Sequence, residues 1–226
     1  MTKGRITSPG MLTSPKQKKP KTRKNRLIFV MGFKNTGKDT FAQMLIDCSY
    51  NTLKRVSFAD ILKTECYPLM SIDPKEYSQE TDDREWKDAH RDEIIRYGEG
   101  QKQKNGRNYW IERALDPYLL PDPQPTKAEG YQDVIVTDCR RVEEVMWYKG
   151  FKLDHHTKYK HLNEIYEPIL FVVHREGAND ADKDYLTHIA LEYAAETRAF
   201  DRMVKNYGTE EDLLRMAKDI WAIRVK

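Results

Sequence analysis

The stretch 27–40, LIFVMGFKNTGKDT, constrains the fold of this chain more than any other part of the sequence. Residues 27–31 are all apolar, which is typical of a strand buried on both faces of a parallel sheet. The segment then fits the pattern G-x-x-x-x-G-K and leads into a helical pattern with Phe41, Met44 and Leu45. Strand, glycine-containing loop and helix in this order predict a nucleotide-binding loop, which surrounds phosphate with backbone N–H groups at a helix N-terminus.

Each residue type in this loop has an expected role in holding phosphate. Gly32 and Gly37 let backbone N–H groups turn inward, and Lys38 neutralises charge on the β- and γ-phosphates. The Ser or Thr that usually follows such a lysine is replaced by Asp39, with Thr40 next, so either residue could hold Mg²⁺ directly or through water. The predicted nucleotide-binding residues are Gly32, Asn35, Thr36, Gly37, Lys38, Asp39 and Thr40.

Charge is distributed unevenly along the 226 residues. The net charge is +3, but residues 1–26 hold nine Lys and Arg and no Asp or Glu, so the other 200 residues carry 30 basic and 36 acidic groups. Residues 1–26 also lack aromatic side chains, which predicts a disordered basic tail before a single α/β domain at 27–226. The tail is either a solvated leader or an anchor that binds DNA by counterion release.

The rest of the composition points to a reduced, cytoplasmic protein. No apolar run approaches the length of a membrane span, and the basic N-terminus has no apolar segment behind it, so neither a membrane anchor nor a secretory signal is expected. Cys48, Cys66 and Cys139 are odd in number and far apart, without a C-x-x-C pair. We expect Cys48 and Cys139 to be small packing residues.

Apolar runs and amphipathic periods continue along the chain and predict an α/β fold. Further strands are expected at 55–59, 133–137, 169–173 and 203–205. A helix is expected from 86 to about 97, interrupted by Gly98 and Gly100, and another from 109 to just before Pro117. A helix after residue 141 should turn Val142, Val145 and Met146 inward, and a capping box at 209–212 should begin the last helix.

Charged residues follow two of these strands at the point where open α/β sheets bind ligands. Asp138, Arg140 and Arg141 come directly after the strand at 133–137, and Arg175 follows the next one. We expect these side chains to lie where phosphates bind, with the polar segment after Arg175 as a lid. The alternative is that the two adjacent arginines only begin a solvated helix.

Two groups of histidines need separate interpretations. Residues 155–161 hold three histidines, but no acid or thiol stands at ligand spacing, so a solvated loop is expected, with a second polyanion contact as the alternative. His188 and Glu192 lie four residues apart and hence on one helical face. Without a third ligand, they predict a hydrogen-bonded pair rather than a metal site.

Seven motifs occur in an order that gives the chain a family resemblance. They are G-x-x-x-x-G-K-D-T at 32–40, S-F-A-D-x-L-K at 57–63, R-D-E-I-I-R-Y-G-E at 91–99, N-Y-W-I at 108–111, V-T-D-C-R-R-V-E-E at 136–144, T-H-x-x-x-E at 187–192 and V-x-N-x-G-T-x-x-D-L at 204–213. The chain resembles the bacteriophage deoxynucleoside monophosphate kinase group, and two stretches also resemble animal-type phosphomevalonate kinase. The resemblance implies a three-layer P-loop kinase fold of the nucleoside-monophosphate-kinase type, with a mainly parallel five-stranded sheet.

The resemblance also implies a chemistry. ATP would be the phosphoryl donor with Mg²⁺ as cofactor, and Asp39 and Asp138 would lie near the metal and the incoming nucleophile. Arg175 would reach the transferring phosphoryl group when a lid closes. The acceptor would be held by Lys63, Arg96, Arg140 and Arg141. The expected catalytic set is Lys38, Asp39, Asp138, Arg140 and Arg175.

Four functions fit this pattern. The basic tail favours a kinase that acts on the hydroxymethyl group of 5-hydroxymethyluracil in phage DNA, as a related group of phage kinases does on the way to hypermodified thymine. A kinase of free deoxynucleoside monophosphates is the alternative, followed by phosphomevalonate kinase, which would not need a polyanion-binding tail. From a different class, the chain could be a nucleic-acid-binding ATPase. A phage origin, which only the resemblance suggests, would place the protein in the host cytoplasm.

Overall fold

The computed structural model of the protein describes residues 24–70, 90–121, 131–178 and 185–223. Four predictions fall wholly or partly outside these ranges. They are the disorder of the basic tail, the first residues of the helix expected from 86, most of the surface loop that is expected at 117–130 from its four prolines, and most of the predicted lid.

The described strands form one five-stranded sheet in the order β2-β3-β1-β4-β5, and every pairing in it is parallel. The strands are β1 (Asn25–Met31), β2 (Lys54–Val56), β3 (Val134–Cys139), β4 (Tyr166–His174) and β5 (Arg202–Lys205). The predicted α/β class and five-stranded parallel sheet are therefore confirmed. Since β1 begins at Asn25, two residues of the predicted tail belong to the central strand.

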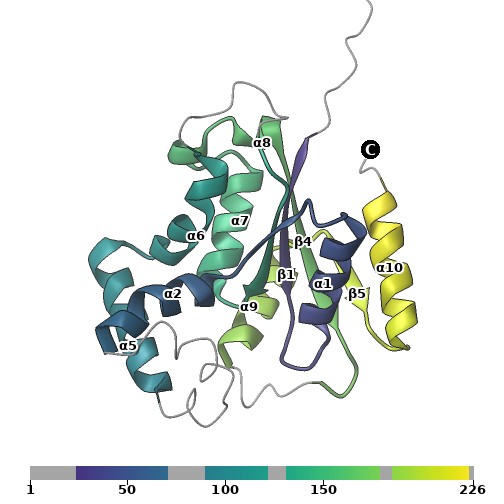
Figure 1. The fold of residues 1–226 in the computed structure, drawn as a ribbon, viewed down its shortest axis with the longest axis horizontal. Coiled ribbons are helices and arrows are strands. Elements are labelled where there is room, and N and C mark those ends of the chain that lie inside the picture. The colour runs from purple at the N-terminus through teal and green to yellow at the C-terminus, as the bar shows by residue number, and fades with distance from the viewer. Residues whose placement is uncertain (1–23, 71–89, 122–130, 179–184, 224–226) are drawn as a thin grey trace, which may run out of the picture.

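Helices cover both faces of this sheet (Figure 1). They are α1 (Lys38–Cys48), α2 (Phe58–Cys66), α5 (Arg91–Asn105), α6 (Tyr109–Leu119), α7 (Val142–Lys152), α8 (Leu162–Ile165), α9 (Tyr185–Glu196) and α10 (Glu210–Ala222), with 3₁₀ turns η1 (Tyr67–Met70) and η3 (Thr157–Tyr159). In Figure 1, α1 and α10 lie on one side of the sheet, and α2, α6 and α7 on the other. None of the helices in the described ranges is both long and apolar enough to cross a membrane.

The wholly apolar sequence of β1 follows from its position at the centre of three layers. Leu27, Phe29 and Met31 belong to the core under α6, α7 and α9, whereas Ile28 and Val30 belong to the core under α1 and α10. Alternate side chains of a strand point to opposite faces of a sheet, so both sets must be apolar. All five are 2% exposed or less, and the predicted doubly buried strand is confirmed.

Two helix ends differ from the sequence prediction. α5 runs through Gly98 and Gly100 and ends at Asn105, because Gly98 packs against α2 and its carbonyl accepts a hydrogen bond of 3.0 Å from Trp110 Nε1. α6 continues past Pro117 to Leu119. The proline lies in the last turn, and burial of Leu119 keeps that turn helical.

Three smaller predictions are also corrected. β2 ends at Val56 because Ser57 caps α2, its hydroxyl accepting from the Asp60 backbone N–H at 3.2 Å. β3 extends through Cys139, so Asp138 lies within the strand. Met146 is 52% exposed, because the apolar side chains of α7 that meet the core are Val145, Trp147, Tyr148 and Phe151.

The histidine segment 155–161, hereafter the hook, is mostly exposed, as expected for a solvated loop, but His156 and Tyr159 in it make specific contacts. His156 Nε2 lies 2.8 Å from the Trp147 carbonyl oxygen, and the buried Tyr159 donates its hydroxyl to Asp116 at 2.7 Å. Lys158 pairs with Asp116 at 2.8 Å and with a second carboxylate of α6. The basic residues of this hook are thus partly neutralised, which weakens its interpretation as a second polyanion contact.

The two glycines inside α5 predict opposite responses to substitution. A Cβ at Gly100 would meet nothing within 4 Å, so Gly100→Ala should raise the free energy of unfolding by about 1 kcal/mol, the usual difference in helix propensity. A Cβ at Gly98 would lie 3.3 Å from both Leu62 methyl groups, so Gly98→Ala should gain less or lose stability. Urea denaturation of both variants measures this, and equal stabilisation would contradict the packing.

Candidate phosphate-binding site

The glycine-containing loop 32–37 follows β1 at the carboxyl edge of the sheet and is a tight turn. Gly32 packs so closely on β4 that a Cβ would lie 2.6 Å from the Val173 carbonyl oxygen and 2.8 Å from Thr36 Oγ1. Gly37 has a φ of +86°, in the left-handed region that favours glycine. The predicted loop therefore needs its two glycines at these two positions, one for close packing and one for backbone conformation.

Asn206 holds this loop in place from the end of β5. Its Nδ2 donates to the Thr36 carbonyl oxygen at 2.9 Å, and its backbone N–H donates to the His174 carbonyl oxygen at 2.8 Å. A Cβ at Gly37 would overlap the Asn206 amide. The sequence analysis quoted this asparagine in a motif but gave it no role. The signal that could have found it is an asparagine directly after a short strand that ends beside the loop.

Lys38 is buried at the start of α1, and its ammonium group contacts the carboxylate of Asp39. The Lys38 side chain is 5% exposed, and its Nζ lies 3.0 Å from Asp39 Oδ2, whereas the Asp39 side chain is 73% exposed. A phosphate oxygen can share this ammonium group with the carboxylate. Thr40 is exposed in the same first turn. The structure therefore brings together Lys38, Asp39 and Thr40, as predicted.

The residues present fit a Mg²⁺ ion that is held mainly by phosphate. The described residues contain no cluster of three or more His, Cys, Asp or Glu that would form an all-protein metal site. Mg²⁺ in nucleotide sites takes one or two protein oxygens, together with phosphate oxygens and water. The exposed carboxylate of Asp39 and the hydroxyl of Thr40 are of this kind.

Asp138 fixes α2 to the end of β3. Its carboxylate accepts hydrogen bonds from the Ser57 hydroxyl at 3.0 Å and from the backbone N–H groups of Phe58 and Ala59 at 3.0 and 2.8 Å. These donors are the cap and the first turn of α2, where a negative charge is favourable. Asp138 thus positions the helix that carries Lys63.

Glu144 is buried beneath the two adjacent arginines. One of its carboxylate oxygens accepts from the Arg140 backbone N–H at 2.5 Å and from the Arg141 backbone N–H at 2.9 Å, which fixes the entry to α7. Burial raises the pKa of Glu144 from 4.5 to about 8, against the lowering effect of these hydrogen bonds. Glu144 is the last residue of the motif at 136–144, but no role was predicted for it. Its position three residues into the helix after Arg141 was the available signal.

The five cationic side chains predicted around the acceptor and the lid share one property. None makes a hydrogen bond or ion pair with a described residue, whereas Lys102, Arg113 and Lys158 elsewhere in the chain are paired with carboxylates. The five are Lys63, Arg96, Arg140, Arg141 and Arg175.

The elements that carry these cations meet at one end of the sheet. α2 begins against Asp138, α5 packs on α2 through Gly98 and Leu62, and α7 begins directly after Arg141. Arg175 follows β4 and lines a shallow pocket of about 320 Å³ together with Asn35 of the phosphate loop. The structure therefore brings Arg175 to the loop and places the other four on neighbouring elements.

The predicted pair on α9 is confirmed and also contacts the loop. His188 Nε2 lies 3.1 Å from Glu192 Oε1, one helical turn further on. The His188 ring stacks on Phe33 of the phosphate loop, with 6.2 Å between ring centroids and 22° between planes. α9 therefore supports the loop from the side opposite to Asn206, and neither residue is part of a metal site within the described ranges.

No model of a known protein family matches this chain, and no curated protein matches it in sequence. Function is therefore inferred from the geometry of the loop and the strand ends, together with the cations that form no ion pair with a described residue.

The buried carboxyl of Glu144 predicts a pH dependence of stability. Because its pKa is about 8 in the folded protein and ordinarily 4.5, folding binds a proton between these values, and the free energy of unfolding falls as pH rises from 4.5 to 8. Glu144→Gln keeps the acceptor oxygen and cannot titrate. It should match the wild type near pH 5 and exceed it by more than about 1 kcal/mol at pH 8.

Glu143→Gln is the matched control for this measurement. Burial opposes ionisation of Glu143, but the hydrogen bond and charge of Lys102, a backbone hydrogen bond and the charge of Arg141 together lower the pKa of this carboxyl. Its removal should leave the decline between pH 5 and pH 8 in place. Chemical denaturation at the two pH values compares the three proteins, and an undiminished decline in Glu144→Gln would refute the assignment.

Proposed function

We propose that the protein is an ATP-dependent kinase that transfers the γ-phosphate to a nucleotide-type acceptor. One observation carries this proposal: a glycine-containing loop, held by Asn206 and followed by the buried Lys38, lies at the carboxyl edge of the sheet beside Arg175, which forms no ion pair with a described residue. Cations without protein partners indicate a polyanionic ligand, because most Lys and Arg side chains that bind no ligand are solvated or paired. A nucleotide with its phosphates, next to a second phosphate-bearing or DNA-borne acceptor, is such a ligand.

The residues of the loop hold the donor. The backbone N–H groups of loop 32–37 and the N-terminus of α1 would bind the phosphates of ATP, with Lys38 placed to neutralise the β- and γ-phosphates. Asp39 and Thr40 would hold Mg²⁺, which when bound neutralises charge that develops during transfer. Arg175 lies beside Asn35 and can approach the γ-phosphate from the opposite side of the loop.

The remaining cations bind and orient the acceptor. Phosphoryl transfer needs positioning and charge neutralisation rather than a covalent intermediate, so Lys63, Arg96 and the arginine pair at 140–141 suffice in this role. Asp138 is a positioning residue for α2, since both of its oxygens are occupied by that helix. This differs from the role near the nucleophile that the family resemblance implies.

The acceptor that we favour is the hydroxymethyl group of 5-hydroxymethyluracil in DNA. The basic tail supports it, since the seven Lys and Arg in residues 1–23, which include no Asp or Glu, would give sequence-independent, salt-sensitive affinity for a polyanion. Free deoxynucleoside monophosphates are the second candidate, supported by the motifs that the chain shares with kinases of these nucleotides. Phosphomevalonate is the third.

Transfer of labelled γ-phosphate from ATP to a panel of acceptors separates these cases. The panel holds DNA with 5-hydroxymethyluracil, unmodified DNA, free deoxynucleoside monophosphates and phosphomevalonate. We expect label on the modified DNA, and none on unmodified DNA, on the four common deoxynucleoside monophosphates or on phosphomevalonate. Label on free monophosphates only would make the protein a nucleotide-pool enzyme. ATP hydrolysis that is stimulated by DNA, without label on any acceptor, would indicate an ATPase and overturn the proposal.

Loss of the loop lysine should abolish transfer while the fold stays intact. Lys38→Ala removes the buried ammonium group beside the phosphates, and we expect kcat to fall by about a hundredfold or more. Lys54→Ala, which removes an exposed lysine at the start of β2, is the control and should retain full activity. Near-normal transfer by Lys38→Ala would exclude the mechanism.

Asn206 predicts a separate effect on donor affinity. Asn206→Ala removes the hydrogen bond to the Thr36 carbonyl and leaves that buried acceptor unsatisfied, which costs about 1–3 kcal/mol. The KM for ATP should therefore rise by about tenfold or more, whereas Lys205→Ala, at the exposed preceding residue, should leave it unchanged. Steady-state kinetics at varied ATP measures both variants, and an unchanged KM in Asn206→Ala would show that the loop holds its shape without this hydrogen bond.

A further inference from the structure

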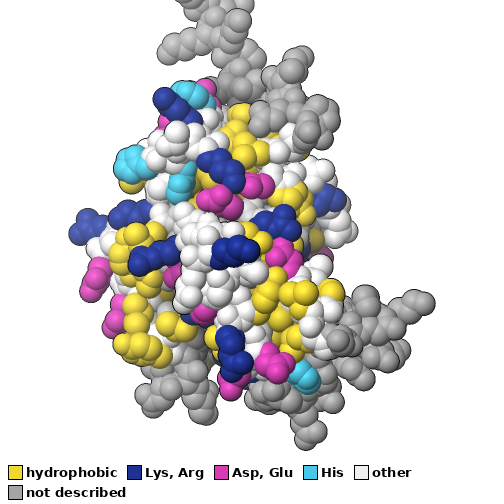
Figure 2. Space-filling model, turned by 90° about the vertical axis from the view of Figure 1, so that its left-hand side faces the viewer, with side chains coloured by type: hydrophobic (Ala, Val, Ile, Leu, Met, Phe, Trp, Pro, Cys, Tyr) yellow, Lys and Arg dark blue, Asp and Glu magenta, His cyan; other side chains and the backbone are white. Residues whose placement is uncertain are grey.

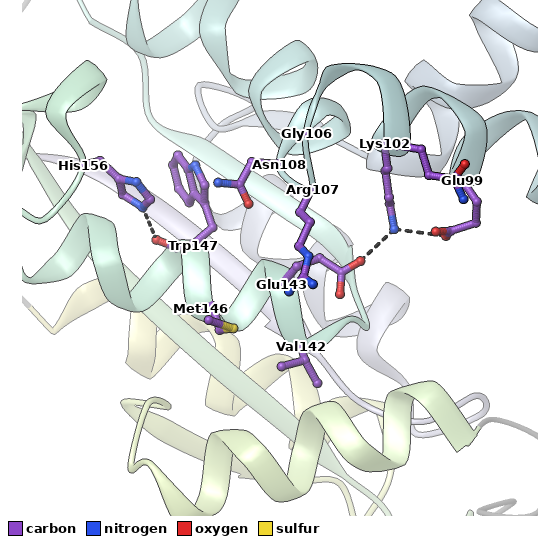
Figure 3. A pocket seen from close by; sticks show the side chains of 11 residues that line it. Glu99, Lys102, Gly106, Arg107, Asn108, Val142, Glu143, Met146, Trp147 and His156 are labelled. Carbon is purple, nitrogen blue, oxygen red and sulfur yellow. Dashed lines mark hydrogen bonds and ion pairs between the residues drawn. The ribbon is translucent and has the colours of Figure 1, made fainter.

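A groove of about 750 Å³ lies between the second half of α5, the α5–α6 connection and α7 (Figure 3). Its volume is within the range of sites for nucleotide-sized ligands. No residue of the phosphate loop and none of the five unpaired cations lines it. The groove is therefore distinct from the donor site, and its chemistry has to be explained separately.

One wall of the groove carries polar side chains that have no partner. Gln103, Arg107 and Asn108 form no side-chain hydrogen bond or ion pair with any described residue. Asn108 precedes α6 directly but does not cap it with its side chain. Amide and guanidinium groups of this kind present paired donors and acceptors in fixed planes, which suits the edge of a nucleobase.

The opposite wall is apolar and belongs to α7. Val142, Met146 and Trp147 face the groove, and Met146 is the side chain that the sequence placed wrongly in the core. Trp147 is 1% exposed, and its Nε1 has no hydrogen-bond partner in the described structure. An apolar wall opposite unpartnered polar groups fits a flat, partly apolar ligand with a polar edge.

The charges along the groove nearly cancel. Lys102 bridges Glu143 at 2.7 Å and Glu99 at 3.2 Å, so it joins α5 to α7 across the groove (Figure 3). On the face of the molecule in Figure 2, basic, acidic and apolar side chains are interspersed, without a continuous stripe of Lys and Arg. A track for the phosphate backbone would be strongly positive, so this groove suits bases better than phosphates.

The groove continues from the acceptor cations. On α7, Val142 follows directly after Arg141, and on α5, Glu99 lies one turn after Arg96. A ligand that spans the distance from these cations into the groove must therefore consist of more than the reacting unit. Neighbouring nucleotides of one strand have this property, since each base is joined to the next through a phosphate.

We propose that this groove binds a nucleobase that is covalently joined to the acceptor nucleotide, so that the acceptor is a residue within a polynucleotide strand. The inference rests on the proposed kinase function and specifies its substrate class. Gln103, Arg107 and Asn108 contact the edge of the base, and Val142 and Met146 contact its face. The arginine pair at 140–141 then orients the neighbouring unit toward the phosphate loop.

Kinetics with two acceptors test the inference. The variants are Arg107→Ala and Met146→Glu, both at exposed positions, with Lys104→Ala as a control that removes a charge from α5 outside the groove. The acceptors are a single-stranded oligonucleotide with one 5-hydroxymethyluracil and the free 5-hydroxymethyldeoxyuridine monophosphate. Each groove variant should raise the KM for the oligonucleotide by about tenfold, with unchanged kcat and an unchanged KM for the monophosphate, and the control should change neither.

Equal effects on both acceptors, or no effect on either, would overturn the inference while leaving the kinase proposal intact. A second measurement does not depend on transfer. An oligonucleotide with 5-iodouracil beside the acceptor position is photocrosslinked to the full chain, and the crosslinked peptides are mapped. Crosslinks within 99–108 or 142–156 support the groove, and crosslinks confined to other segments refute it, even if the protein transfers phosphate to no acceptor in the panel.

Discussion

The central strand β1, which is buried on both faces, is the constraint on which the rest of the structure depends. A strand without a polar face needs a neighbouring strand on each edge and a helical layer on each side. The chain supplies β3 and β4 as neighbours, and it places α1 and α10 in one helical layer and α6, α7 and α9 in the other. Because all pairings are parallel, every strand ends at the same edge, and that edge receives the loop after β1.

Polar side chains then fix the strand ends relative to one another. Asp138 joins the end of β3 to α2, Asn206 joins the end of β5 to the loop, and Glu144 fixes the entry to α7. All three side chains are buried or half-buried. Asp138 and Glu144 accept hydrogen bonds from backbone N–H groups, and Asn206 donates one to a backbone carbonyl. Around this frame of hydrogen bonds, Lys63, Arg96, Arg140, Arg141 and Arg175 form no ion pair with any residue that the structure describes.

The sequence predicted the parts of the fold that follow from local patterns. The doubly buried strand, the glycine-containing loop and the capping box that begins at Thr209 depend on neighbouring residues, and the structure confirms all three. Two features that the sequence did not predict depend on contacts distant in sequence. α5 passes through Gly98 because Leu62 and Trp110 pack there, and the hook at 155–161 is ordered by carboxylates of α6.

The site shows the same division. Lys38, Asp39 and Thr40 were predictable because the loop motif contains them, and Arg175 because it directly follows a strand. The supports of the loop, Asn206 and the Phe33–His188 stack, were not, since they come from β5 and α9. Motif residues can thus be read from one stretch, whereas the groups that hold them require the topology.

The distribution of charge distinguishes the proposed phosphate site from the proposed base-binding groove. Outside residues 1–26 the chain carries an excess of acidic groups, so overall attraction cannot bring a polyanion to the body. Unpaired cations are instead concentrated near the strand ends, whereas in the neighbouring groove Lys102 is bound by two carboxylates. A site that neutralises phosphates beside a nearly neutral site with amide donors is what recognition of one particular nucleotide requires, because phosphate contacts position a strand and base contacts select the residue.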